Sequence, residues 1–261
     1  NHLNSKIKIN FENKIKEIFD YLIVADGVFS NTKSIIFNKN IKPEYFGSLA
    51  LRTLIDKKNL NFLNKENVSL FLGSKVHIVA YPINAKREMN LVVILRKKLI
   101  NQEFDDKSFF NNNDNIIKII NETSIKENIN FKELFNNIND FKCFPIFISD
   151  RTRECNYKNI FFLGDAFYAF PPTFAQGASQ SIESAYELYN ILNKDNKKFY
   201  KNYFINRTKK TKMIDRRSKL NYFMFHISNP ALVVIRNIFL KFIVKNTIFL
   251  NKYLGKIYLK K

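Results

Sequence analysis

The chain of 261 residues has an ordinary globular composition, with 46% hydrophobic and 25% charged residues, so we expect a folded protein with one large core or two smaller ones. Its formal net charge of +20 is spread along the sequence, which favours a solvated basic surface over a nucleic-acid partner. The two cysteines and three histidines are scattered, which predicts no metal site and fits a reducing cytoplasm, and no apolar run of about 18 residues predicts a membrane span.

The first predicted elements are a hairpin and a buried strand. Apolar and polar residues alternate over residues 6–19, and this pattern predicts a β-hairpin with its turn at Asn13-Lys14. The continuous apolar run at residues 21–25 then predicts a strand buried on both faces. That strand ends at Asp26-Gly27.

A β-rich region followed by helices is predicted for the middle of the chain. Residues 45–55 and 68–96 are predicted to form strands. Within the second range, residues 76–82 and 89–95 should pair as a hairpin around residues 84–86. Residues 101–140 are rich in Asn, with apolar residues at helical spacing near 116–120 and again at 131–138. We expect a loop and two short helices there.

A second buried strand is predicted at residues 160–163, followed by a loop that contains two prolines. A helix should then run from about residue 174 to 192, with Thr173 and Gln176 as a capping box at its start. From residue 197 to the end the pattern is helical and basic. The buried face predicted for the helix at 174–192 is its apolar stripe, which consists of Ala178, Ile182, Ala185, Tyr189 and Leu192.

Each of the two buried strands ends in an acid beside a glycine, at Asp26-Gly27 and at Gly164-Asp165. In open α/β sheets, ligands bind beyond the carboxyl ends of the strands. A carboxylate there can accept hydrogen bonds from ribose hydroxyls, and a glycine lets a ligand approach the backbone closely. The alternative for either loop alone is an ordinary strand-to-loop turn.

The segment after the second strand is more specific. Residues 164–185 read GDAFYAFPPTFAQGASQSIESA, which resembles the GD motif of the class A FAD-dependent monooxygenases, the family of the salicylate and hydroxybenzoate hydroxylases. Residues 22–30, LIVADGVFS, resemble the DG motif of the same family, and residues 77–93 resemble its HxVxYP and NxVxV segments. Tyr203, Arg207 and Lys210 match its C-terminal pattern loosely.

The resemblance implies a cofactor and a class of reaction. Members of this family reduce FAD with NAD(P)H and use O₂ to place one oxygen atom on an activated ring, so the substrate would be a small aromatic or quinone-precursor molecule. The cofactor-binding residues that it implies are Asp26, Gly27, Gly164, Asp165, Pro171, Pro172, Gln176, Gly177 and Ala178.

The resemblance also implies a role for each of these residues. Asp165 would bind ribitol or ribose hydroxyls, and the prolines would shape the loop beside the isoalloxazine. The backbone amides of residues 176–178 would face the pyrimidine edge of the flavin, where a helix N-terminus favours negative charge. Asp26-Gly27 would lie near the pyrophosphate and the route of the nicotinamide nucleotide.

Two further residues are candidates for catalysis. Arg52, which follows Leu51 as in the aromatic-Arg pair of the family, is a candidate contact to flavin or substrate, and the alternative is a solvated arginine on a strand. His77 is a candidate general base for a phenol because the free pKa of histidine lies near neutrality, and the alternative is a structural histidine.

The sequence departs from the family pattern in three places. Tyr168 replaces the usual His, with Phe167 in place of the preceding Ala, and Ser184 replaces an acid. The glycine-rich GxGxxG turn is missing, and the chain starts just before the DG motif without an initiator Met. We therefore expect a chain truncated at its N-terminus that alone binds FAD weakly and is inactive.

These patterns together predict an α/β fold with an incomplete FAD-binding Rossmann-like domain, an inserted β-rich substrate domain and C-terminal helices. The FAD domain would comprise residues 1–34 and 143–192, the substrate domain residues 35–142, and the basic helical region residues 193–261. Two alternatives stay open for the function: a ubiquinone-biosynthesis-type hydroxylase or carotenoid-type epoxidase, and an inactive basic remnant that binds a membrane or a partner.

The C-terminal segment 230–258 is expected to form one or two amphipathic helices that dock on an apolar surface. Lysines gather on one side of its helical wheel, and large apolar residues lie mainly on the other. Packing against the FAD domain of the protein is one interpretation, and peripheral attachment to an anionic membrane is the other.

Overall fold

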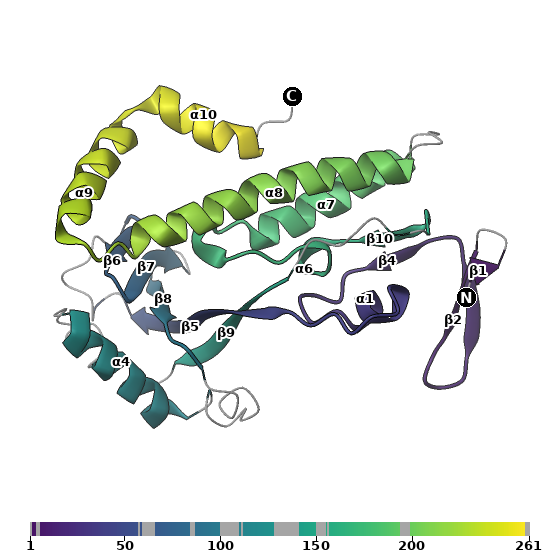
Figure 1. The fold of residues 1–261 in the computed structure, drawn as a ribbon, viewed down its shortest axis with the longest axis horizontal. Coiled ribbons are helices and arrows are strands. Elements are labelled where there is room, and N and C mark those ends of the chain that lie inside the picture. The colour runs from purple at the N-terminus through teal and green to yellow at the C-terminus, as the bar shows by residue number, and fades with distance from the viewer. Residues whose placement is uncertain are drawn as a thin grey trace. The chain divides into compact units, whose positions relative to one another are not determined.

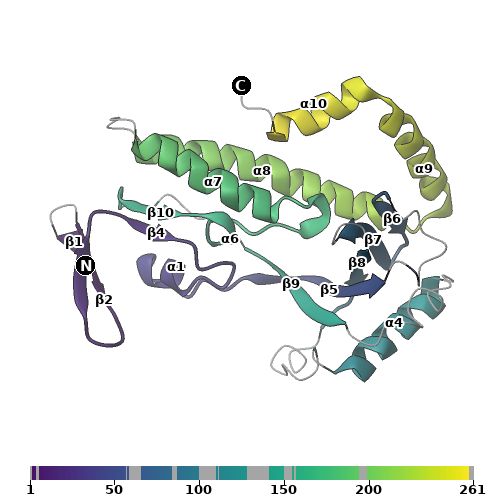
Figure 2. The ribbon, with the colours of Figure 1, turned by 180° about the vertical axis from the view of Figure 1, so that it is seen from behind.

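The computed structural model of the chain (Figures 1 and 2) describes residues 2–3, 6–56, 58, 66–83, 87–99, 110, 112–127, 141–149, 155, 157–193 and 199–258. The chain divides into two compact units, the first Asn1–Glu44 with Phe147–Asn221 and the second Tyr45–Ile146 with Tyr222–Lys261. The elements are β1 (His2–Leu3), β2 (Lys6–Asn10), β3 (Lys16–Phe19), β4 (Leu22–Val24), α1 (Asn31–Ile36), β5 (Glu44–Asp56), β6 (Ser69–Leu72), β7 (Val76–Ile83), β8 (Glu88–Arg96), α4 (Asn113–Glu127), β9 (Lys142–Ile148), β10 (Ile160–Phe162), α6 (Gly164–Phe167), the 3-10 turn η3 (Pro172–Phe174), α7 (Gly177–Leu192), α8 (Phe199–Phe225), α9 (Pro230–Lys245) and α10 (Thr247–Tyr258).

The first unit begins with a small antiparallel sheet in the order β1-β2-β3. The hairpin predicted over residues 6–19 is confirmed, since β2 pairs with β3 and the N–H of Phe11 donates to the carbonyl of Ile15 at 2.9 Å. The turn also lies where it was predicted, because Lys14 has a left-handed φ of 65°.

The two predicted buried strands, β4 and β10, form a parallel pair in which Ile23 lies opposite Phe161. Burial on both faces is confirmed for β10, whose three residues are all buried. It is wrong for β4, because Ile23 is 49% exposed while Val24 is buried. Within the described part of the chain this sheet has only these two strands.

The connection from β10 to α7 differs from the prediction in detail. Gly164–Phe167 form the short helix α6 inside the predicted loop, and α7 begins at Gly177. The predicted capping box is wrong, because the hydroxyl of Thr173 donates to the carbonyl of Ser218 at 2.5 Å and Gln176, the N-cap residue, makes no side-chain cap. Thr173 therefore ties the loop to α8.

Helices α7 and α8 lie side by side in both views (Figures 1 and 2), and the face that α7 buries is not the predicted one. Ile182 and Tyr189 of the apolar stripe are 72% and 63% exposed, whereas Gln180, Ser184 and Leu188 are buried. The reason is a buried arginine on α8, Arg207, which requires polar partners from α7.

The second unit is built on an antiparallel sheet with the strand order β6-β7-β8-β5-β9. The strands predicted at 45–55 and 68–96 and the first predicted helix, now α4, are confirmed. The turn at 84–86 and the second helix at 131–138 lie outside the described residues. One sheet face packs against α4 to form the largest core, which includes Leu49, Leu51, Met89, Leu91, Val93, Ile116 and Ile120.

Both cysteines are free and buried, one in each unit. Cys143 lies in the core beside α4, and burial raises the pKa of its thiol to about 12. Cys155 packs with Phe161 and Leu188 in the first unit, and burial likewise raises its pKa. Both thiols are therefore protonated near neutral pH.

The C-terminal prediction of helices is confirmed, since residues 230–258 form α9 and α10 with a break at Asn246. Among the described helices, none combines the length and the apolar character that crossing a membrane requires.

Core packing in the second unit can be tested with two leucines of β5 that differ in burial. Leu51 is 1% exposed and Leu54 is 54% exposed. We expect Leu51→Ala to lower the free energy of unfolding by about 2–5 kcal/mol, because the cavity it leaves is added to the lost burial. Leu54→Ala should cost less than about 1 kcal/mol. Urea denaturation measures both, and equal losses would contradict the assignment of the buried face.

Candidate functional site

Gly164 is the residue that the site requires most strictly to be a glycine. Its φ of 53° lies in the left-handed region, and a Cβ built on it would meet the Oγ of Ser181 at 2.5 Å. Its N–H also donates to the Oγ of Ser184 at 3.4 Å. The end of β10 therefore lies directly against α7, an approach that only a glycine permits.

The start of α7 is open to solvent. Gln176 is buried and provides no side-chain cap, no atom lies within 4 Å of a Cβ built on Gly177, and Ala178 is exposed. The first amides of a helix have no partners within it, so this terminus presents N–H groups and a partial positive charge.

Asp165 lies beside this helix start, in the first turn of α6. The residue is exposed, yet the surrounding protein partly desolvates its carboxylate and raises its pKa above the usual value. The loop that follows contains Pro171, which is buried, and Pro172, which is exposed and opens η3. The chain thus places an exposed acid, two prolines and an uncapped helix N-terminus in one short connection.

The loop at Asp26 begins at the same end of the two-stranded sheet as the loop at Gly164. β4 and β10 are parallel neighbours, and the N–H of Leu163 donates to the carbonyl of Val24 at 2.9 Å. The structure therefore brings Asp26-Gly27 and Gly164-Asp165 to the carboxyl ends of adjacent strands, where ligands bind in open sheets.

Asp26 also has a role within the protein. Its carboxylate accepts from the N–H of Thr32 at 3.2 Å, at the start of α1. Partial burial acts to raise its pKa, but hydrogen bonds from Ser30 and Thr32 outweigh this and hold the pKa below its usual value. Gly27 has a φ of 79° with open space around it, so it is needed for the turn itself.

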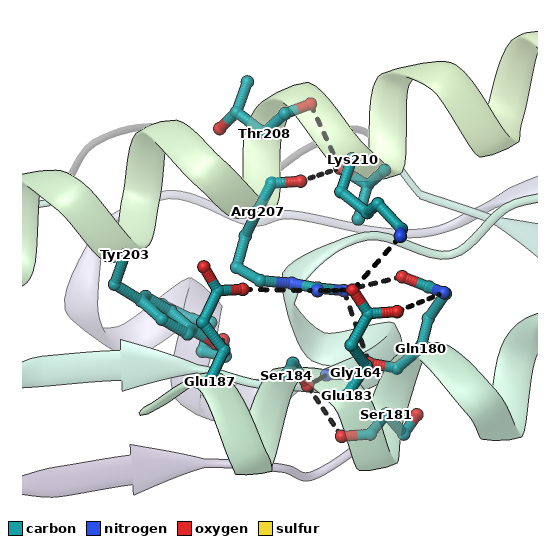
Figure 3. A network of polar contacts seen from close by, with 12 residues as sticks. Gly164, Gln180, Ser181, Glu183, Ser184, Glu187, Tyr203, Arg207, Thr208 and Lys210 are labelled. Atoms are coloured by element: carbon teal, nitrogen blue, oxygen red, sulfur yellow. Dashed lines mark hydrogen bonds and ion pairs between the residues drawn. The ribbon is translucent and has the colours of Figure 1, made fainter. Parts of the chain in front are cut away.

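Sequence reasoning missed the polar network behind the site, which Figure 3 shows. Arg207 is 2% exposed, and its guanidinium lies 3.4 Å from both Glu183 and Glu187 and donates to Gln180 Oε1 at 2.9 Å. Lys210 adds an ion pair to Glu183 at 3.3 Å. The loose match of Arg207 and Lys210 to the family pattern was the available signal.

His77 and Arg52 lie in the second unit, whereas all the predicted cofactor residues lie in the first. Strand register puts both side chains on the sheet face opposite α4, since Arg52 pairs with Val92 and Val92 with Val79, two residues from His77. Arg52 is exposed. His77 is buried, with its Nδ1 3.1 Å from Nε2 of His226.

Burial, with a smaller contribution from His226, lowers the pKa of His77 from 6.5 to about 3. The ring is therefore neutral near neutral pH. Its role as a general base stays a prediction, as do the roles of the other predicted site residues.

The chain shares its fold with FAD-dependent aromatic hydroxylases of known structure. Klebsiella pneumoniae HpxO, complexed with FAD and uric acid, matches with a TM-score of 0.71 at 15% identity over 90% of this chain. A salicylate hydroxylase in complex with its substrate matches with a TM-score of 0.71 at 16% identity over 88% of this chain. The chain spans 59% and 61% of the length of these two structures.

The sequence is also similar to that of a characterised epoxidase. Chloroplastic zeaxanthin epoxidase from an Oncidium hybrid cultivar is 25% identical over 204 residues, which is 74% of this chain and 28% of the epoxidase. No family model matches the sequence.

The close approach at Gly164 predicts a sharp difference between two glycines. Gly164→Ala should lower the free energy of unfolding by about 1–3 kcal/mol, from its left-handed φ and its contact with Ser181. Gly177→Ala is the matched control, and it should be neutral or stabilise by up to about 1 kcal/mol, since it lies in a helix with open space. Chemical denaturation compares them, and a neutral Gly164→Ala variant would rule out the proposed close packing.

The histidine pair predicts acid sensitivity. Unfolded His77 binds a proton near pH 6.5, whereas the folded protein binds it only near pH 3, so between these values protons favour unfolding. Lowering the pH from about 7 to about 5 should therefore remove roughly 2 kcal/mol of stability through this group. His77→Phe should make the midpoint of urea denaturation less dependent on pH. The same pH dependence in this variant and in the parent protein would contradict the assignment.

Proposed function

We propose that the chain is part of an FAD-dependent monooxygenase that transfers one oxygen atom from O₂ to an aromatic or similar ring, with NAD(P)H as the electron donor. The observation that carries the proposal is the connection from β10 to α7. It joins a buried parallel strand to an uncapped helix N-terminus through Gly164, which its left-handed φ and its close packing against Ser181 both require to be a glycine. The shared fold with flavin hydroxylases supports the same conclusion.

The residues at this connection fit the chemistry of FAD. Asp165 offers an exposed carboxylate that can accept hydrogen bonds from ribitol or ribose hydroxyls. The amides of Gln176, Gly177 and Ala178 begin α7, where a negative charge is stabilised, and the pyrimidine edge of a reduced flavin carries such a charge. We propose that the first unit binds FAD in this way, with Pro171 and Pro172 shaping the loop beside it.

Bound FAD would supply the redox chemistry with O₂, which side chains cannot perform. The protein would then have to orient the ring and exclude water. We propose that the sheet face of the second unit opposite α4 supplies the substrate surface, with exposed Arg52 as its contact to the substrate. His77 is a weak base for a phenol in this structure, because burial, with a smaller contribution from His226, lowers its pKa to about 3.

A second candidate is the epoxidation or hydroxylation of a lipid-like ring, as in the carotenoid-type or ubiquinone-type alternatives. The likeness to zeaxanthin epoxidase over 74% of this chain favours it. Turnover screens with small phenols and with isoprenoid rings would distinguish the two substrate classes. A purified full-length protein without flavin absorbance would instead favour an inactive remnant.

The proposed cofactor contact can be tested in the full-length protein. Asp165→Ala should weaken FAD binding by about 5- to 150-fold, since a hydroxyl left without its acceptor costs about 1–3 kcal/mol. Asp20→Ala is the matched control, because the Asp20 side chain is 72% exposed in a surface ion pair with Lys6 and should not affect FAD. Titration followed by flavin fluorescence measures both, and an unchanged affinity in Asp165→Ala would reject the role of this residue.

A further inference from the structure

Helix α9 exposes a continuous apolar face. Ile235, Ile238, Phe239 and Phe242 are 61%, 65%, 50% and 71% exposed, and they follow the spacing i, i+3, i+4, i+7 of a single helical face. Exposed Ile248 and Phe249 continue the apolar surface onto α10. An exposed patch of this kind marks a surface that binds another apolar phase.

The orientation of α9 is fixed by its one arginine. Arg236 is buried, and its guanidinium donates to the carbonyls of Met224 and Phe225 at 3.3 and 3.5 Å, at the C-terminal end of α8. Cations are stabilised at that end of a helix, where the last carbonyls lack partners. The helix therefore turns its arginine inward and its isoleucines and phenylalanines outward, the reverse of the arrangement of an ordinary surface helix.

The charges around this face are all of one sign. Residues 230–258 contain no Asp or Glu, whereas Lys241, Lys245 and Lys252 are exposed. At about 100° per residue, Lys241 and Lys245 both lie along one border of the apolar face of α9. Lysines beside an apolar face place their ammonium groups at headgroup level while the apolar side chains enter the bilayer surface.

We propose that α9 and α10 attach the protein peripherally to an anionic membrane surface. An acid-free surface with flanking lysines is complementary to anionic headgroups, and it disfavours a second copy of the same positively charged segment. The exposed stripe of α7 gives an internal contrast, because Ile182 and Tyr186 are exposed there but residues 177–192 contain no Lys or Arg. Exposed apolar side chains alone do not make a membrane surface, and the α9–α10 segment has the charge that α7 lacks.

Co-sedimentation with vesicles tests the proposal on the full chain. We expect binding to phosphatidylcholine vesicles that contain about one quarter phosphatidylserine, and much weaker binding to phosphatidylcholine alone. The double variant Ile238→Asn with Phe242→Asn should bind the anionic vesicles at least about tenfold more weakly, because it removes two inserted side chains. Lys241→Glu with Lys245→Glu should also weaken binding about tenfold or more, and added salt should weaken binding of the parent protein.

The matched control is Ile182→Asn with Tyr186→Asn, which removes an exposed i, i+4 pair from α7 and should leave vesicle binding unchanged. Circular dichroism establishes that every variant keeps its helices. Equal sedimentation of the parent and the Ile238/Phe242 variant overturns the proposal. The proposal is also overturned if light scattering shows that the parent protein is a dimer and this variant a monomer, and the parent does not bind vesicles. The apolar face would then join two copies of the chain. Vesicle binding needs neither FAD nor turnover, so the result is independent of the proposed reaction.

Discussion

The first unit depends on how α8 holds the two ends of one connection. Tyr203 and Arg207 are four residues apart on α8 and therefore share a face. The hydroxyl of Tyr203 donates to the carbonyl of Phe162 at the end of β10, at 2.8 Å, while Arg207 binds Gln180, Glu183 and Glu187 on α7. The loop from Gly164 to Gln176 is thus held at its start by one side chain and beyond its end by the other.

The buried charge of Arg207 explains why α7 lies as it does. Taking a guanidinium out of water costs several kcal/mol unless carboxylates and hydrogen bonds compensate it, and removing one partner of such a group is strongly destabilising. Only one rotation of α7 brings Gln180, Glu183 and Glu187 to Arg207 together, and that rotation also places Ser184 against Gly164. The helix turns its apolar stripe outward because the buried cation outweighs what burying that stripe would contribute. A stable position of the loop that faces the proposed cofactor follows from the same constraint.

Sequence patterns predicted the structural features that depend on residues close together in the chain. The alternation of apolar and polar residues predicted the hairpin of β2 and β3 correctly. Continuous apolar runs predicted the strands β4 and β10, and the GD motif predicted the connection that contains Gly164. The errors concern contacts between distant residues. Thr173 caps nothing because Ser218, 45 residues away, accepts its hydroxyl, and the apolar stripe of α7 is exposed because of Arg207. His77 is buried against His226, which is 149 residues away, and no local pattern around either histidine indicates the pair.

The two buried thiols have a practical consequence for chemical labelling. A thiol reacts with alkylating agents as its thiolate, and burial holds the pKa of Cys143 at about 12 and raises that of Cys155. The native chain should therefore react very slowly with maleimides while it stays folded. A single cysteine introduced at an exposed position would carry a fluorescent or spin label selectively, without removal of the two natural cysteines. Such a label would report on the local surroundings of the unit that carries it.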